Sequence, residues 1–151
     1  MTAPALDPID HSLIRLLQQD GRRPYTQLAK EVGLSEAAVR QRVQRLLDQG
    51  TMQIVAVTDP LQLGLARQAM IMIRVEGDVR QVADQLEKID QVDYLVLTAG
   101  SVDLIAEVVV SDDESLLELL NDKIRSVPGV VGTETIMYLA LRKQTYQWGT
   151  R

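Results

Sequence analysis

The second half of this 151-residue chain repeats one pattern twice, and that repeat restricts the fold more than any other feature. In each copy, an apolar β-branched segment precedes an amphipathic helical segment and a second apolar segment. The predicted elements are strand 69–75, helix 79–89, strand 93–97, strand 102–110, helix 112–126 and strand 130–141. Two strand–helix–strand units predict a ferredoxin-like βαββαβ domain, in which both helices cover one face of a four-stranded antiparallel sheet.

The alternation along strand 102–110 predicts which face each side chain occupies. The residues predicted to face the helices are Val102, Leu104, Ala106 and Val108. The opposite face is predicted to carry Asp103, Ile105, Glu107 and Val109, together with Met70 and Met72. Because this open face also carries apolar residues, we expect it to pack against a second copy of the chain.

The first fifty residues predict three short helices, so the chain as a whole is α+β. Asp7-Pro8 begins the first helix, Pro24 precedes the second, and Gly33-Leu34-Ser35 separates the second from the third, 36–49. This spacing is typical of a helix-turn-helix. A short β segment, 53–58, is predicted to form a wing or hinge, which makes the domain winged-helix-like. The predicted boundaries are 1–52, hinge and linker 53–66, ligand-binding domain 67–143 and C-terminal tail 144–151.

Charge is distributed unevenly between the two parts of the chain. The formal net charge is −5, yet residues 1–50 hold seven basic and six acidic side chains. Residues 21–47 hold six basic side chains against two acidic ones. This asymmetry favours a nucleic-acid-facing head on an acidic body, although a generic solvated surface explains the charge alone equally well.

The chain lacks the side chains that most enzyme and metal sites need. It contains no Cys and a single His, His11, so thiol nucleophiles and two-His metal sites are excluded. We therefore expect no enzyme activity, no cofactor and no metal. No apolar run is long enough for a membrane helix, and the segment Met1–Asp10 lacks the features of a secretory signal. These features predict a cytoplasmic protein without a membrane partner.

The third helix carries the residues predicted to contact double-stranded DNA. At 100° per residue, its outward side shows Gln and Arg, the side chains suited to adenine and guanine edges in the major groove. Arginines at its edges and before the second helix are predicted to bind phosphates. The alternative is an ordinary amphipathic helix with a solvated face. The predicted DNA-binding set is Arg22, Arg23, Ser35, Ala37, Arg40, Gln41, Arg42, Gln44 and Arg45.

A second pattern extends over residues 6–143. In the first domain it consists of Leu6-Asp7, Asp10, Ile14, Leu17, Asp20-Gly21-Arg22, Leu28-Ala29, Val32-Gly33-Leu34-Ser35, Val39, Arg42-Val43, Leu46 and Gly50. In the second domain it includes a Gly-x-x-Asp element, Gly100 to Asp103, and Thr135 on the last strand. This pattern resembles the Lrp/AsnC regulators, the feast/famine transcription factors of bacteria and archaea. The family implies sheet-to-sheet dimers, assembly to octamers or similar forms, and amino-acid effectors bound between dimers.

The resemblance also implies where an effector binds. The candidate effector-binding residues are Tyr94, Thr98, Gly100, Ser101, Asp103 and Thr135. Asp103 stands in an aliphatic strand, where an unpaired buried carboxylate is costly, so it either accepts a hydrogen bond from a ligand ammonium or caps its own turn. Gly100 either contacts ligand or only shapes the turn.

Taken together, the sequence predicts a sequence-specific transcription regulator that responds to a small effector, an amino acid. One alternative is an architectural, weakly specific DNA-compacting protein of the same fold. Another is a ferredoxin-like enzyme or metabolite carrier with a vestigial helix-turn-helix, which the missing catalytic motifs disfavour.

Overall fold

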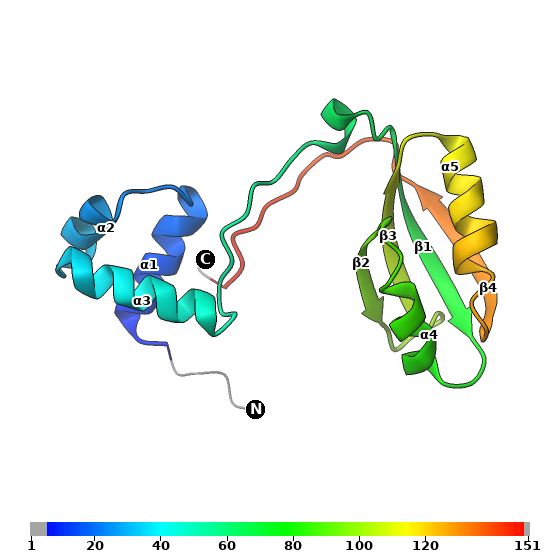
Figure 1. Cartoon of the computed structure of the whole chain (residues 1–151), viewed down its shortest axis with the longest axis horizontal. Coiled ribbons are helices and arrows are strands. Elements are labelled where there is room, and N and C mark those ends of the chain that lie inside the picture. The colour runs from blue at the N-terminus through cyan, green and yellow to red at the C-terminus, as the bar shows by residue number, and fades with distance from the viewer. Residues whose placement is uncertain (1–5, 150–151) are drawn as a thin grey trace. The chain divides into compact units, whose positions relative to one another are not determined.

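The computed structural model describes residues 6–149 (Figure 1). The chain divides into two units, which are described one at a time below. The first comprises the chain up to Val57 together with the C-terminal segment from Lys143, and the second runs from Thr58 to Arg142. The expectations for residues 1–5 and for 150–151 lie outside the described part of the chain.

The first unit contains three helices, α1 (Pro8–Gln19), α2 (Tyr25–Val32) and α3 (Glu36–Asp48). Helix α1 begins with a capping box, in which the Asp7 and Asp10 carboxylates accept hydrogen bonds from each other's backbone N–H. Gly33 ends α2 in the left-handed conformation at a φ of 71°. The Ser35 hydroxyl then caps α3 by accepting from the backbone N–H of Ala38 at 3.2 Å. The structure confirms the helix-turn-helix.

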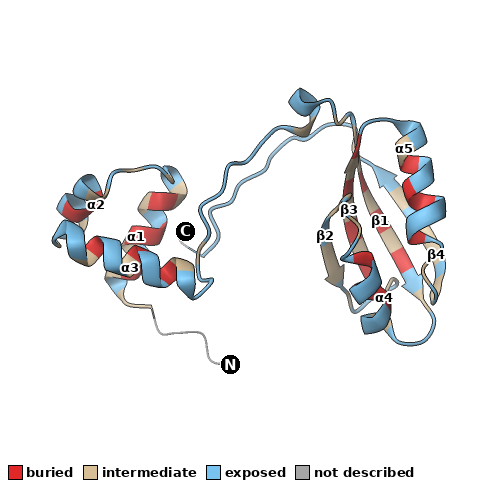
Figure 2. Ribbon diagram, in the orientation of Figure 1, coloured by how far each residue is buried: buried red, intermediate tan, exposed pale blue. Residues whose placement is uncertain are grey.

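The inner faces of these helices meet in a small apolar core (Figure 2). Its fully buried members are Leu13, Leu28, Val39 and Val43. The prediction of a β segment at 53–58 is wrong, because these residues form no strand. Their β-branched side chains favour extended backbone, but a strand also needs a neighbour for its N–H and C=O groups. Within residues 6–149, no segment pairs with 53–58, so no wing forms.

The second unit begins with a short 3-10 turn, η1 (Pro60–Leu63), and confirms the ferredoxin-like fold. Its sheet has the strand order β2-β3-β1-β4, and every neighbouring pair is antiparallel. Helices α4 and α5 cover the same face of the sheet (Figure 1). The elements are β1 (Arg67–Val75), α4 (Val79–Leu86), β2 (Val92–Leu97), β3 (Leu104–Val110), α5 (Asp113–Glu118), its π-helical continuation η2 (Leu119–Ile124) and β4 (Val130–Met137).

Several predicted elements are longer than the real ones. The last strand ends at Met137 and not Leu141, because β1 begins at Arg67 and leaves only the hydrogen bond from Tyr138 N to Gln68 O beyond it. Val102 belongs to the turn before β3, and Ile89 lies in the turn after α4. The predicted helix 112–126 is regular α-helix only as far as Glu118.

The predicted alternation of the sheet is confirmed where the strands are regular. Side chains of β1 and β3 alternate between a buried helix face and a half-buried open face. The buried set is Ala69, Ile71, Ile73, Leu104, Ala106, Val108 and Val110. The open face carries Met70, Met72, Ile105 and Val109, as expected.

Candidate DNA and effector sites

The side of α3 that faces away from the core forms a shallow hollow of about 730 Å³. Its lining is Ala37, Arg40, Gln41, Gln44, Arg45, Asp48 and Gln49. The outward residues predicted from helical periodicity therefore do share one surface. The surface is rich in hydrogen-bond donors and contains one small residue, Ala37, which permits close approach of a partner.

Neighbouring side chains hold two of these donors in place. Gln44 Nε2 donates to Asp48 Oδ1 at 2.8 Å, one helical turn away. Arg40 Nη2 donates to Glu36 Oε1 at 2.9 Å, and the Arg40 guanidinium lies 4.7 Å from the centre of the Tyr25 ring. Tyr25 therefore links α2 to the edge of this surface of α3.

Arg42 and Arg45 form an ionic cluster with two aspartates of α1. Arg42 Nη1 donates to Asp7 Oδ2 at 2.6 Å and to Asp10 Oδ1 at 2.9 Å. Arg45 Nη2 lies 2.7 Å from both carboxylate oxygens of Asp10. The pKa of Asp7 is lowered, first by the hydrogen bond from the Asp10 N–H and then by Arg42, and the pKa of Arg42 is raised, chiefly by Asp7.

Asp10 is the one buried charged side chain among the described residues, and its pairing with two arginines was not predicted from the sequence. Two signals point to it. Asp7 and Asp10 have the spacing of a capping box, and Arg42 and Arg45 are three residues apart and so share one face of α3. The charge count of residues 21–47 consequently overstated the free positive charge on this unit.

The other arginines predicted to bind phosphate differ in whether their charge is already paired with a carboxylate. Arg23 is mostly buried, and its Nη1 donates to both carboxylate oxygens of Glu31 at 3.2 Å. Arg22 is exposed and, like Lys30, forms no ion pair within the described chain. These two are therefore the free cations beside α2.

The candidate effector residues fall on two faces of the sheet. Thr135 pairs with Ile71 on β1, whose side chain is buried under the helices. Tyr94 pairs with Glu107, which in turn pairs with Met70 of the open face. Cross-strand partners share a face, so Tyr94 and Thr135 point to opposite sides of the sheet. They do not line one pocket within a single copy of the chain.

The remaining candidates lie together in the turn between β2 and β3. The Thr98 hydroxyl donates to the Val102 carbonyl at 2.6 Å. The backbone N–H of Thr98 donates to the Asp103 carbonyl at 2.9 Å. Asp103 Oδ2 accepts a 2.7 Å hydrogen bond from the backbone N–H of Val75. Asp103 thus has a structural role, because it ties the end of β1 to the turn that carries Gly100 and Ser101.

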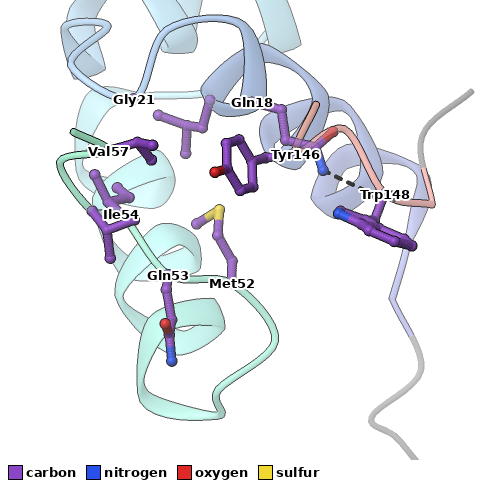
Figure 3. A pocket seen from close by; sticks show the side chains of 10 residues that line it. Gln18, Gly21, Met52, Gln53, Ile54, Val57, Tyr146 and Trp148 are labelled. Atoms are coloured by element: carbon purple, nitrogen blue, oxygen red, sulfur yellow. Dashed lines mark hydrogen bonds between the residues drawn. The ribbon is translucent and has the colours of Figure 1, made fainter. Parts of the chain in front are cut away.

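A second hollow of about 380 Å³ lies against α1 in the first unit (Figure 3). Tyr146 of the C-terminal segment directs its ring into the hollow. The amide of Gln18 donates to the Trp148 carbonyl at 3.0 Å, which anchors this segment to α1. Residues 52–55 and Val57 line the other side. The sequence analysis treated residues 144–151 as a tail, and two aromatic side chains in an aromatic-poor chain were the signal it missed.

The described residues provide neither a group of metal ligands nor a membrane-spanning helix. Residues 6–149 contain no group of three or more His, Cys, Asp or Glu side chains able to hold a metal ion. No helix in this range has the length and apolar character needed to cross a membrane.

The fold and the surface of α3 define a helix-turn-helix regulator with a separate ferredoxin-like domain. The AsnC-type helix-turn-helix domain matches residues 6–47, and the Lrp/AsnC ligand binding domain matches residues 68–148. The chain belongs to the Lrp/AsnC family of helix-turn-helix transcriptional regulators and is not an enzyme. DNA binding through the helix-turn-helix and a domain for small ligands are properties of this family.

Individual relatives agree with this assignment. The chain is 34% identical over 143 residues to the HTH-type transcriptional regulator FL11 of Pyrococcus abyssi, covering 93% of this chain and 94% of the relative. The leucine response regulatory protein LrpA of Mycobacterium tuberculosis superposes with a TM-score of 0.86 at 31% identity, over 94% and 98% of the two chains. A complex of the Neisseria meningitidis regulator NMB0573 with L-Met has the same fold, with a TM-score of 0.83 at 24% identity over 93% and 94%.

Proposed function

We propose that this protein is a sequence-specific regulator whose DNA affinity or assembly state responds to an amino acid. The proposal of sequence-specific DNA binding rests on the exposed face of α3, where Gln41, Gln44 and Arg45 line one hollow. Glutamine and arginine make bidentate contacts to adenine and guanine edges, whereas Arg22 beside α2 is placed for phosphate. We also propose the cytoplasm as the protein's place of action.

Sequencing the genomic DNA that the purified protein retains tests specificity. Discrete sites with two-fold symmetry support a regulator that reads bases. Uniform coverage of the genome supports the alternative, an architectural DNA-compacting protein. In matched binding assays, we expect Gln41→Ala to cost about 1–3 kcal/mol on specific sites only, and Arg22→Ala to weaken all DNA alike. Equal losses for Gln41→Ala on specific and random DNA contradict base reading.

The proposal of an amino-acid effector is supported by the ligand-binding domain and by two similar proteins. LrpA is named for a response to leucine, and the neisserial protein of the same fold was crystallised with L-Met. We propose that an amino acid binds at the Gly100–Asp103 turn between two dimers, with backbone N–H groups and the Ser101 hydroxyl near the ligand carboxylate. Asp103 Oδ1 then faces the ligand ammonium while Oδ2 keeps its bond to Val75. Thr135 of a second copy contributes from the other side.

Calorimetry with the twenty amino acids tests this site. The informative variant is Asp103→Asn, because the amide oxygen still accepts from Val75 N–H while the negative charge is lost. We expect effector affinity to fall about ten- to a hundredfold, with effector-free DNA binding unchanged. Unchanged effector affinity in Asp103→Asn assigns the residue to the turn alone.

We propose a dimer as the minimum unit, assembling further to octamers or similar forms. The open sheet face carries the apolar side chains of Met70, Met72, Ile105 and Val109 beside Glu107, and a second copy covers these apolar side chains most economically. Light scattering at low micromolar concentration tests this. A stable monomer contradicts both the open-face interface and an effector site between dimers.

A further inference from the structure

Asp10 has an arrangement that its capping role alone does not require. Its side chain is 1% exposed, yet it carries a carboxylate. Oδ1 accepts from Arg42 and Arg45, and Oδ2 accepts from Arg45 and from the backbone N–H of Asp7. A buried carboxylate is tolerated only when its oxygens are satisfied, and here both arginines come from α3. Asp10 therefore connects the start of α1 directly to the DNA-facing helix.

Arg45 differs from Arg42 in how much of its guanidinium group remains exposed and able to donate hydrogen bonds to a partner. The Arg42 side chain is 28% exposed and binds both aspartates, so it is committed to the cluster. The Arg45 side chain is 46% exposed, uses only Nη2 for Asp10, and lines the same hollow as Gln41 and Gln44. One nitrogen of its guanidinium is fixed from behind, while part of the group faces the surface predicted to read bases.

Fixing an arginine in this way has a known physical consequence. A free arginine loses rotamer freedom when it binds, and a preorganised guanidinium loses less per hydrogen bond formed. The carboxylate also neutralises much of the arginine's charge, which weakens nonspecific attraction to phosphate and leaves directional hydrogen bonding. Both effects favour discrimination between bases over general DNA affinity.

We infer that Asp10 is a positioning residue that orients Arg45 to read a guanine edge in the major groove. This inference rests on the proposed function, sequence-specific DNA binding. Arg45 lines the same hollow as Gln41 and Gln44, whose side chains suit base edges, and this favours a base edge over a phosphate. Asp10 touches no DNA itself and acts through the Arg45 guanidinium.

The test compares base preference at every operator position for the full-length protein and its variants. The variants are Arg45→Gln, Asp10→Asn and the double variant. Asn keeps the size and one acceptor oxygen of Asp10 but loses its charge. We expect Asp10→Asn and Arg45→Gln each to lose about tenfold discrimination at the same G·C pair, and the double variant to lose no more than Arg45→Gln alone. Asp7→Asn is the matched control, because Asn also caps helices and Asp7 does not touch Arg45.

Three outcomes overturn the inference. Uniform weakening across all sequences by Arg45→Gln makes Arg45 a phosphate contact. A preference profile of Asp10→Asn equal to wild type makes Asp10 a purely structural clamp. If wild type selects no discrete site, the proposed function fails, and the inference fails with it. Should Asp10→Asn unfold, Asp10→Glu retains the charge and the capping box while moving the carboxylate, and is expected to alter preference at that same pair alone.

Discussion

The two units of this protein hold themselves together by different means. In the helical unit, ion pairs join separate segments: Asp10 of α1 binds Arg42 and Arg45 of α3, and Arg23, in the loop before α2, binds Glu31 of α2. In the sheet unit, the core is a continuous aliphatic layer that contains Ile71 and Leu104. Its one ion pair among the described residues, Arg67 with Asp113, is exposed.

The difference reflects how much apolar surface each unit can bury. Three short helices enclose few side chains, so directional ionic contacts add to the stability of the packing and orient α3. A four-stranded sheet under two helices buries enough aliphatic surface without them. The helical unit thus combines a small apolar core with ionic contacts, whereas the sheet unit, which is proposed to bind the effector, is held by apolar packing.

The largest expected effect comes from the aliphatic layer. Leu104 is fully buried between the sheet and its helices, so Leu104→Ala is expected to lower the free energy of unfolding of the sheet unit by about 2–5 kcal/mol. Hydrogen exchange resolved by segment should show faster exchange in β1 and β3 and unchanged exchange in α1–α3. Leu28→Ala is the reciprocal control in the helical core. Equal acceleration in both units by either variant would refute independent packing.

The next effect tests the ionic side of the comparison. Asp10→Ala leaves two guanidinium groups without their buried partner, and we expect a loss of about 2–3 kcal/mol in the helical unit. Asp113→Ala removes an aspartate whose side chain is 78% exposed, and we expect much less change in the sheet unit. Urea unfolding monitored by segment-resolved exchange compares the two. Losses of similar size would mean that the buried cluster contributes no more than a surface pair.

Glycines at two turns extend the comparison to backbone strain. Gly33 and Gly129 both have positive φ, 71° and 98°. A Cβ at Gly33 meets nothing within 4 Å, so Gly33→Ala is expected to cost about 1 kcal/mol from conformation alone. A Cβ at Gly129 lies 2.9 Å from Val82 Cγ2 and 3.2 Å from the Glu76 carbonyl, so Gly129→Ala is expected to cost about 2–4 kcal/mol. Thermal unfolding of the two variants checks the order, and equal losses would mean that Val82 and the Glu76 carbonyl move away from the new Cβ at little cost.

Most of the fold follows from local patterns in the sequence. Caps at Asp7 and Ser35, the turn at Gly33 and the period-two alternation of β3 predict the helices, the turn and the buried face. The predicted strand at 53–58 failed for a nonlocal reason. Its residues suit extended backbone, but pairing depends on a partner that no local pattern specifies.

The candidate DNA surface was predictable because helical periodicity places Ala37, Gln41, Gln44 and Arg45 on one side. The ionic cluster was not, because Asp10 and Arg45 meet only through the packing of α1 on α3. Strand pairing separated Tyr94 from Thr135 for the same reason. Register between strands, and not residue type, decides which face each side chain occupies.

The smallest expected effect is a loss of stability in acid, which leaves both units unchanged at neutral pH. The pKa of Asp7 lies below its ordinary 3.8 because the folded state donates the Asp10 N–H and the Arg42 guanidinium to it. The pKa of Asp112 is also lowered, first by the backbone N–H of Ser115 and then by its hydroxyl. A lowered folded pKa stabilises the unit above about pH 4, and this stabilisation is lost as pH falls through the folded pKa.

Both units are therefore expected to weaken below about pH 4, for different reasons. In Asp7 part of the lowering comes from Arg42, so added salt should shrink the acid-sensitive component in the helical unit. In Asp112 the leading causes are hydrogen bonds within the first turn of α5, so salt should change the Asp112 contribution to the sheet unit less. Segment-resolved exchange from pH 2 to 6 at two salt concentrations measures this. Asp7→Asn and Asp112→Asn keep a capping oxygen and should each reduce the acid response of their own unit, while Asp113, whose pKa is lowered by Arg67, retains part of the response in the sheet unit. An unchanged acid response in Asp7→Asn would assign the acid sensitivity of the helical unit to other carboxylates.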